Sequence, residues 1–243
     1  MRIVAIIQAR MGSTRLPGKV LQDINGQTML SHVVQRVRLA KLLDQVIVAT
    51  TVEAADDPIV VACKNLEVEV FRGSENDVLD RYFQASQAYD AGTIVRITSD
   101  CPLIDPTLID KVIHAYLQEA ADYAGNALTR TYPRGLDTEV IAQPALTRTW
   151  QEATEPYQRA HVTPYIYQNP QLFHLASVKS VTDYSNHRWT VDTFEDLQLV
   201  RAIYSRMAAK PLFSWQEVLN LLNQEPELQT LNQHIKQKSL EEG

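Results

Sequence analysis

The stretch Ile3-Val4-Ala5-Ile6-Ile7 decides the fold, together with the loop that follows it, Arg10-Met11-Gly12-Ser13-Thr14-Arg15-Leu16-Pro17-Gly18-Lys19. The apolar run is rich in β-branched residues and has no helical period, which is typical of a strand buried on both faces of a parallel sheet. The loop carries three cations, two hydroxyls and two glycines. An open α/β sheet binds its ligand at the carboxyl ends of its strands, and cations with exposed backbone N–H groups suit phosphate. The stretch therefore predicts a polyphosphate site.

Two well-known phosphate-binding motifs do not explain this loop. A P-loop has the pattern G-x-x-x-x-G-K-[ST], but five residues separate Gly12 from Gly18 here, and Val20 stands where the motif needs a hydroxyl. The dinucleotide fingerprint G-x-G-x-x-G is also absent. The loop therefore predicts a phosphate cradle of another kind. The alternative is a solvated turn, and three cations in ten residues count against it.

Beyond the loop, apolar patterning predicts strands that alternate with helices. The predicted elements are a helix over 29–43, a strand over 45–50, a helix that Asp57 opens as its N-cap, and strands over 68–71, 93–99 and 189–193. This alternation predicts an α/β fold with a doubly wound, mostly parallel, Rossmann-like sheet. We expect a single domain over 1–243, with a small α+β excursion over 122–188 and a helical tail over 211–243.

Composition and charge argue against several classes of protein. The 243 residues carry a formal net charge of −6 without a basic stripe, which argues against a nucleic-acid partner. Two cysteines are too few for a disulfide framework or a zinc site, and they fit a reducing cytoplasm. The sequence shows no leader pattern and no apolar run near 18 residues, so we expect neither a signal peptide nor a membrane span.

Two aspartates follow predicted strands at the same edge of the predicted sheet. Asp100 comes directly after the strand over 93–99, and Asp192 lies near the end of the strand over 189–193. Carboxylates in this position can hold Mg²⁺, which prefers oxygen ligands. Two alternatives stay open: Asp100 only accepts turn N–H groups, or Asp192 only caps the next helix, which Thr193-x-x-Asp196 would open as a capping box.

The residues from Ile6 to Lys19 resemble the opening signature of the cytidylyltransferases that activate acidic sugars. These are the CMP-sialic-acid and CMP-KDO synthetases, and most closely the SpsF type of spore-coat polysaccharide synthesis. The resemblance extends more weakly to about residue 200 and includes Thr-Ser-Asp-Cys-Pro-Leu at 98–103. It implies a GT-A-like nucleotidyltransferase fold. It also implies transfer of CMP from CTP to a sugar acid of nonulosonic or octulosonic type, with release of pyrophosphate, in surface polysaccharide biosynthesis.

The same resemblance implies a set of site residues, a Mg²⁺ cofactor and a homodimer formed through the region 122–188. The implied nucleotide-binding residues are Arg10, Gly12, Ser13, Arg15, Lys19, Arg72, Asp77 and Arg81, of which Arg10, Arg15 and Lys19 would be catalytic. The implied metal ligands are Asp100 and Asp192, and the implied sugar-binding residues are Arg134, His187 and Arg188.

Three other functions stay open at this point. A glycosyltransferase of the GT-A type would bind its metal through a D-x-D motif, but Thr98 and Pro102 flank Asp100 at the two possible positions. A nucleotidyltransferase of different base specificity is possible because no residue reads cytosine unambiguously. A nucleotide-binding regulatory module is the non-enzymatic alternative, and the presence of three loop cations and two carboxylates argues against it.

Overall fold

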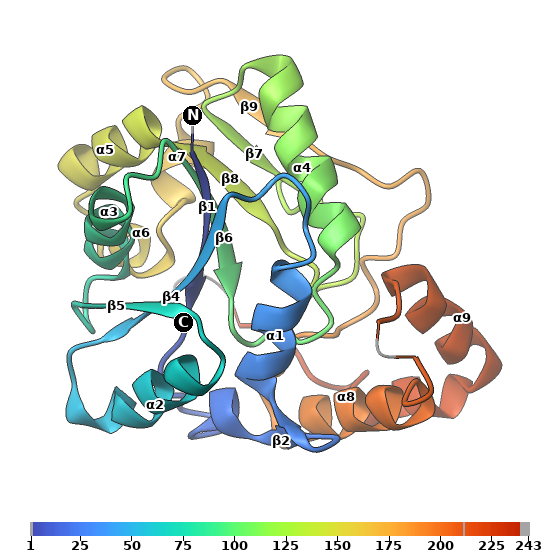
Figure 1. The fold of residues 1–243 in the computed structure, drawn as a ribbon. Helices are drawn as coiled ribbons and strands as arrows, with labels where there is room; N and C mark the ends of the chain where they lie inside the picture. The colour runs from blue at the N-terminus through green and yellow to red at the C-terminus, as the bar shows by residue number, and fades with distance from the viewer. Residues whose placement is uncertain (1, 211, 239–243) are drawn as a thin grey trace.

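A seven-stranded sheet forms the centre of the computed structural model, which describes residues 2–210 and 212–238 (Figure 1). The strand order is β5-β4-β1-β6-β8-β7-β9. The strands are β1 (Ile3–Gln8), β4 (Gln45–Thr51), β5 (Glu69–Gly73), β6 (Thr93–Thr98), β7 (Tyr123–Gly125), β8 (Glu139–Ala142) and β9 (Leu175–Ser177). Among these strands only β8 runs antiparallel to its neighbours. The predicted mostly parallel α/β sheet is confirmed. A short ribbon of β2 (Asp23–Ile24) and β3 (Gln27–Thr28) lies outside it.

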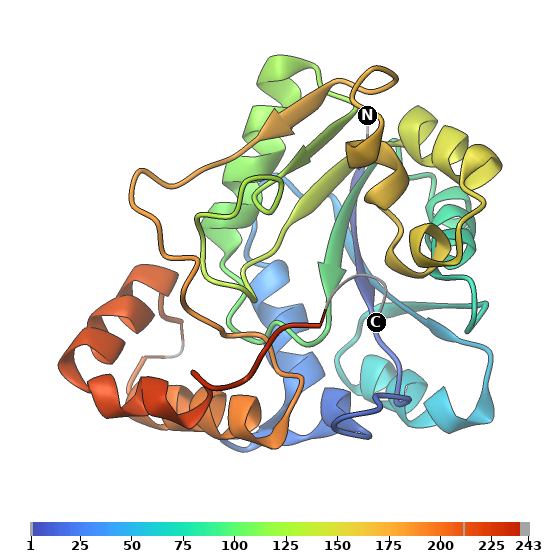
Figure 2. The same ribbon diagram turned by 180° about the vertical axis from the view of Figure 1, so that it is seen from behind.

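Helices cover both faces of the sheet, as Figures 1 and 2 show. The helices of the first face are α1 (Met29–Val37), α2 (Asp57–Asn65), α4 (Pro106–Glu119), α8 (Phe194–Arg206) and α9 (Trp215–Gln224). Those of the second face are α3 (Val78–Ala88), α5 (Gln143–Glu152), α6 (Pro156–His161) and α7 (Pro164–Gln168). Three short 3-10 helices complete the list, η1 (Lys19–Leu21), η2 (Ala54–Asp56) and η3 (Pro226–Leu231). No helix in the described ranges is both long and apolar enough to cross a membrane.

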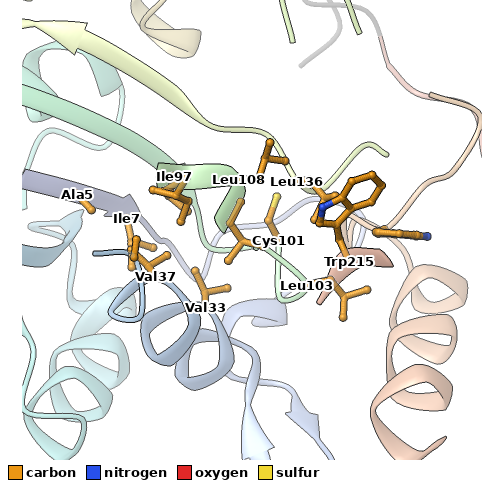
Figure 3. Close-up of a cluster of buried hydrophobic side chains, with 14 of the residues drawn as sticks. Ala5, Ile7, Val33, Val37, Ile97, Cys101, Leu103, Leu108, Leu136 and Trp215 are labelled. Carbon is orange, nitrogen blue, oxygen red and sulfur yellow. The ribbon is translucent and has the colours of Figure 1, made fainter. Parts of the chain in front are cut away.

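The apolar run in β1 is buried on both faces because the two hydrophobic clusters meet there. Ile3, Ala5 and Ile7 point into the first cluster, and Val4 and Ile6 point into the second. This alternation follows the two-residue period of a strand. Figure 3 shows part of the first cluster, where Ile7 lies beside a side chain of α1. The strand is therefore fixed as the centre of the fold.

The strand order reverses between β1 and β6, and this reversal positions the site. From β1 the chain adds β4 and then β5 on one side, and it then crosses to the other side of β1 to form β6. The loops after the carboxyl ends of two such strands run in opposite directions. The crevice between these loops is the usual ligand site of an open α/β sheet. The loop over 10–19 leaves β1, and Asp100 follows β6, so both lie at this crevice.

Two predicted helix boundaries are wrong. The helix predicted over 29–43 ends at Val37, because the Asp110 carboxylate accepts hydrogen bonds from the backbone N–H groups of Lys41 and Leu42 and turns this segment onto α4. Asp56, not Asp57, holds the N-cap position of α2. The predicted tail over 211–243 contains α9 and η3 and extends into residues outside the described ranges. The single domain, the 122–188 excursion and the homodimer stay predictions.

The strand predicted over 189–193 is also wrong. No residue of this segment lies in a strand, and the isolated bridge between Arg134 and Arg188 lies directly before it. The segment is tied to loops instead, since Trp189 N–H donates to Arg134 O at 2.7 Å and Val191 N–H donates to Asp100 O at 2.8 Å. The hydrogen-bonded register between β6 and β8 ends at Arg96, so this antiparallel neighbour does not extend to Asp100. Asp192 therefore reaches the crevice on a segment without strand neighbours.

Gly135 allows this segment to pass close to the backbone that precedes β8. Its φ angle is +104°, and a Cβ there would lie 2.5 Å from Thr190 N and 2.6 Å from the carbonyl carbon of Trp189. Gly26 has a similar φ of +85°, but a Cβ there would meet no atom within 4 Å.

We predict that Gly135→Ala lowers the free energy of unfolding by about 2–5 kcal/mol, because backbone strain and a steric clash add together. The matched control, Gly26→Ala, should cost only the strain of about 1–2 kcal/mol. Urea denaturation of both variants measures the two losses. Equal losses would show that the contact between Gly135 and the segment at Thr190 has no energetic importance.

Candidate active site

The peptide of Met11 organises the loop that follows β1. Its carbonyl accepts hydrogen bonds from Ser13 N–H at 2.9 Å and Gly18 N–H at 3.0 Å. Its N–H donates to the carboxylate of Asp56 at 2.7 Å, and that buried carboxylate also accepts hydrogen bonds from the N–H and hydroxyl of Thr51 at the end of β4. The loop is therefore closed by its own backbone and fixed to the neighbouring strand. The sequence analysis missed Asp56, since nothing local marks a buried loop anchor.

Lys19 lies at the centre of the site. Its Nζ is 2.9 Å from Asp100 Oδ2, 2.9 Å from Asp192 Oδ1 and 2.7 Å from the carbonyl oxygen of Val191. Arg15 reaches the other oxygen of Asp192, with Nη2 and Oδ2 3.0 Å apart. The structure thus brings together four residues that the sequence singled out, from three separate parts of the chain.

The charges in this cluster stabilise one another in their ionised forms. Burial by itself would raise the pKa of Asp100, but the Lys19 ammonium and the hydroxyl of Thr98, which donates to Asp100 at 2.6 Å, lower it to about 2. Burial by itself would lower the pKa of Lys19, but the charges of Asp100 and Asp192 outweigh it and the pKa is raised. The site therefore holds a charged ammonium between two carboxylates at neutral pH.

The lowered pKa of Asp100 gives a testable pH dependence. Because the pKa falls from 3.8 in the unfolded chain to about 2 in the folded protein, ionised Asp100 stabilises the fold above pH 4, and this contribution disappears as the pH falls toward 2. We expect the wild-type protein to have a higher Tm than Asp100→Asn at pH 5, and the difference to shrink between pH 4 and pH 2. Thermal unfolding at matched ionic strength measures it. A difference that stays constant over this range would contradict the assigned pKa.

Two further arginines give the phosphate side of the site a positive charge. In the described part of the chain the guanidinium of Arg10 has no hydrogen bond and no ion pair, and the residue is exposed. Arg81 is buried and donates to Ser74 O at 2.9 Å. Burial lowers the pKa of Arg81, and the nearby charge of Arg10 lowers it further. Two cations close enough for their charges to interact are typical of an anion site. Gly12 belongs to the same loop as Arg10, and a Cβ there would meet only Glu75 Oε1, at 3.9 Å.

The other three residues predicted to contact the nucleotide are bonded to protein groups. Arg72 donates to Thr51 O at 2.8 Å and Glu53 O at 2.9 Å, and it pairs with Asp57 at 2.7 Å. Asp77 caps α3 through Asp80 N–H and forms an ion pair with Arg159 at 2.7 Å. The hydroxyl of Ser13 accepts from Leu16 N–H at a long 3.4 Å. Contacts of these three side chains with a nucleotide stay predictions.

The three residues predicted to bind sugar differ in their surroundings. The guanidinium of Arg134 has no hydrogen bond or ion pair within the described ranges, and burial lowers its pKa. Arg188 is engaged, because it bonds to Asp192, Asp196 and Gln237. The ring of His187 lies 5.8 Å from that of Trp189 and lines a separate cavity of about 180 Å³. Of the two arginines, only Arg134 thus has a guanidinium without a protein partner in the described part of the chain.

A larger cavity of about 350 Å³ opens beside Thr98 at the end of β6, and the sequence analysis missed most of its walls. Its polar lining residues are Arg96, Thr98, Tyr123, Arg130, Asp137, Glu139, His161, Thr163 and Tyr167. Arg96 pairs with Glu139, and Arg130 pairs with Asp137. The available signal was Arg96 itself, a charged residue inside an otherwise apolar strand, which requires a partner when it is buried.

The fold and the loop together define a nucleotide-binding α/β protein whose site lies at the reversal of strand order. A family model described as Cytidylyltransferase matches residues 4–239. The chain belongs to the cytidylyltransferase family, which confirms the resemblance seen in the opening stretch.

Two curated relatives and one solved structure illustrate this membership. The chain is 35% identical over 235 residues to the spore coat polysaccharide biosynthesis protein SpsF of Bacillus subtilis, with 94% of this chain and 97% of that protein covered. It is 37% identical over 132 residues to a 3-deoxy-manno-octulosonate cytidylyltransferase of Geotalea daltonii, covering 54% of this chain and 51% of the relative. The structure of a cytidylyltransferase from Leptospira borgpetersenii is similar with a TM-score of 0.90 and 34% identity, covering 98% of this chain and 100% of that one.

Proposed function

We propose that this protein transfers CMP from CTP to the anomeric hydroxyl of a sugar acid of nonulosonic or octulosonic type and releases pyrophosphate. In this proposal it acts in the cytoplasm, in surface polysaccharide biosynthesis. The observation that carries the proposal is the convergence of Asp100, Asp192 and the cationic loop at the crevice between β1 and β6. The names of the relatives, SpsF and a 3-deoxy-manno-octulosonate cytidylyltransferase, support the choice of substrate class.

The cations of the loop suit the leaving pyrophosphate. In such a transfer the sugar hydroxyl attacks the α-phosphorus in line, and negative charge develops on the leaving group. The guanidinium of Arg10 has no protein partner within the described ranges, so it loses no contact when it binds phosphate. Arg15 pairs with Asp192 and Lys19 with Asp100, and each can exchange its carboxylate partner for phosphate oxygens. Guanidinium groups bind phosphate through two parallel hydrogen bonds, whereas the ammonium acts as a point charge.

The two carboxylates fit a divalent cation. Asp100 Oδ2, Asp192 Oδ1 and the Val191 carbonyl oxygen already surround one positive group, Lys19 Nζ, at 2.7–2.9 Å. Mg²⁺ prefers such oxygen donors and often takes few protein ligands beside phosphate oxygens and water. In the described ranges no group of three or more acidic, histidine or cysteine side chains could hold a metal ion. In this proposal phosphate oxygens and water therefore fill the coordination positions that Asp100 and Asp192 leave open. When bound, the ion would neutralise phosphate charge and promote ionisation of the sugar hydroxyl.

The position of Arg134 fits a carboxylate on the anomeric carbon of the acceptor. In a 2-ulosonic acid the carboxylate is attached to the carbon that bears the attacking hydroxyl, so it must lie close to the metal-binding carboxylates. The backbone of Arg134 bridges to that of Arg188, four residues before Asp192, and Asp137, three residues after Arg134, lines the larger cavity. In this proposal Arg134 holds the carboxylate while the body of the sugar occupies the cavity of about 350 Å³.

A panel of the four nucleoside triphosphates against sugar acids and neutral sugars tests the proposal through pyrophosphate release. We expect release only with CTP and a sugar acid, whereas a glycosyltransferase would release a nucleoside diphosphate. Arg134→Gln should raise the KM for the sugar acid about 10-fold or more, because it removes a charge-assisted hydrogen bond, and should leave the KM for CTP unchanged. The control is Arg148→Gln, which alters an exposed pair with Glu152. Equal turnover with neutral sugars would refute the substrate class.

Lys19→Ala should lower kcat about 100-fold or more, because the variant loses a preorganised cation at the leaving group. Circular dichroism should show that the variant remains folded. Lys64→Ala, which changes an exposed lysine in the last turn of α2, serves as the control with unchanged kcat. A near-normal kcat in Lys19→Ala would remove Lys19 from the catalytic residues.

A further inference from the structure

Asp196 makes more contacts than a helix cap requires. It is fully buried, and its carboxylate accepts five hydrogen bonds. The donors are Arg188 Nε at 2.9 Å, Arg188 Nη2 at 3.1 Å, Asn232 Nδ2 at 2.8 Å, Asp192 N–H at 3.0 Å and Thr193 N–H at 3.1 Å. A capping box accounts for the Thr193 contact alone.

Arg188 connects Asp196 to the carboxylate of Asp192. Its Nη2 donates to Asp192 Oδ2 at 2.8 Å, while the same guanidinium bonds to Asp196. The chain after η3 holds Arg188 from the other side, since Asn232 Nδ2 donates to its carbonyl at 2.9 Å and Gln237 Oε1 accepts from its Nη1 at 2.6 Å. Figure 2 shows this C-terminal stretch running along the segment that precedes α8.

Asp192 needs this support because no strand orients it. Asp100 is placed by β6, whose hydrogen bonds to β1 and β8 fix its direction. Asp192 lies on an irregular segment, so its backbone direction depends on the bonds from its own N–H to Asp196 and from Val191 N–H to Asp100 O. Arg188 and Arg15 both contact its Oδ2, and of these two only Arg188 is itself held by Asp196.

We propose that Asp196, Arg188 and Asn232 are positioning residues that hold Asp192 Oδ2, so that Oδ1 faces Asp100 across the cation position. This inference rests on the proposed function, because it concerns the carboxylate pair to which we assign the divalent cation. It gives Arg188 a role different from the sugar contact that the sequence predicted.

The chain offers a matched control in the second capping box. Glu217 occupies the same position in α9 that Asp196 occupies in α8, and it accepts a hydrogen bond from Ser214 N–H at 2.9 Å. None of the described contacts connects Glu217 with the carboxylate pair. Glu217→Gln therefore tests the loss of a capping charge together with a surface ion pair to Lys210, and Asp196→Asn tests the loss of a capping charge together with the loss of support for Asp192.

The experiment is a Mn²⁺ titration of the full chain with saturating CTP, monitored by the EPR signal of free Mn²⁺ and corrected by the same titration of CTP without protein. We expect Asp196→Asn to raise the half-saturating Mn²⁺ concentration about 10- to 100-fold, as is typical when a residue that orients a metal ligand is removed. Asn232→Ala should shift it in the same direction by a smaller factor, and Glu217→Gln should leave it unchanged. If Asp196→Asn does not fold, the half-saturating Mn²⁺ concentration of Asn232→Ala tests the positioning role by itself.

An unchanged Mn²⁺ half-saturation in both Asp196→Asn and Asn232→Ala, with tight binding by the wild-type protein, would overturn the positioning role alone. A wild-type protein that binds no Mn²⁺ with CTP would overturn the metal site of the proposed function and the positioning role together. A failure to use sugar acids would leave the Mn²⁺ result intact and would contradict only the acceptor. The two proposals can therefore fail separately.

Discussion

The ion contacts of Lys19 with Asp100 and Asp192 are the interaction on which the site depends. Two carboxylates that approach the same point repel each other, and partial burial increases that repulsion because the local dielectric is low. Lys19 Nζ, 2.9 Å from an oxygen of each, compensates both charges. It also joins the loop after β1 to the end of β6 and to the segment before α8. Three distant parts of the sequence thus meet at one ammonium group.

The sheet brings these parts together because of how its strands are ordered. β1 is flanked by β4 and β6, and its side chains supply both hydrophobic clusters, so its position is determined by packing on two faces. Parallel neighbours end at the same edge, and this strand order by itself places the loop over 10–19 close to Asp100, before any contact between their side chains is considered. The strand order brings the loop and Asp100 together, and the ion contacts then fix the orientation of their side chains.

This division explains which features could be predicted from the sequence. The run over 3–7, the loop cations and Asp100 are local patterns tied to a strand, and their placement followed from that strand. Asp192 reached the expected place for a different reason from the predicted one, since the segment over 189–193 is not a strand. Its position depends on Gly135 and on backbone bonds to residues far away in the chain, which no local period records.

The arginines show that the local sequence does not determine which side chains can bind a ligand. Arg134 and Arg188 look alike in the sequence, yet the first guanidinium has no partner within the described ranges and the second is held by Asp192, Asp196 and Gln237. Whether an arginine can bind a ligand depends on the carboxylates that tertiary structure places beside it. The pairs Arg96 with Glu139 and Arg130 with Asp137 could not be found from spacing for this reason.

The charges of the described cluster also bear on what it can bind. Its three cations, Arg15, Lys19 and Arg188, are balanced by three carboxylates, Asp100, Asp192 and Asp196. A polyphosphate would add several negative charges to this balanced set, so favourable binding requires further positive charge. Arg10 can supply part of it, and a divalent cation held by Asp100 and Asp192 would supply more while freeing Lys19 to contact phosphate. The balance of charges among these six side chains therefore favours a nucleotide that arrives together with its metal ion.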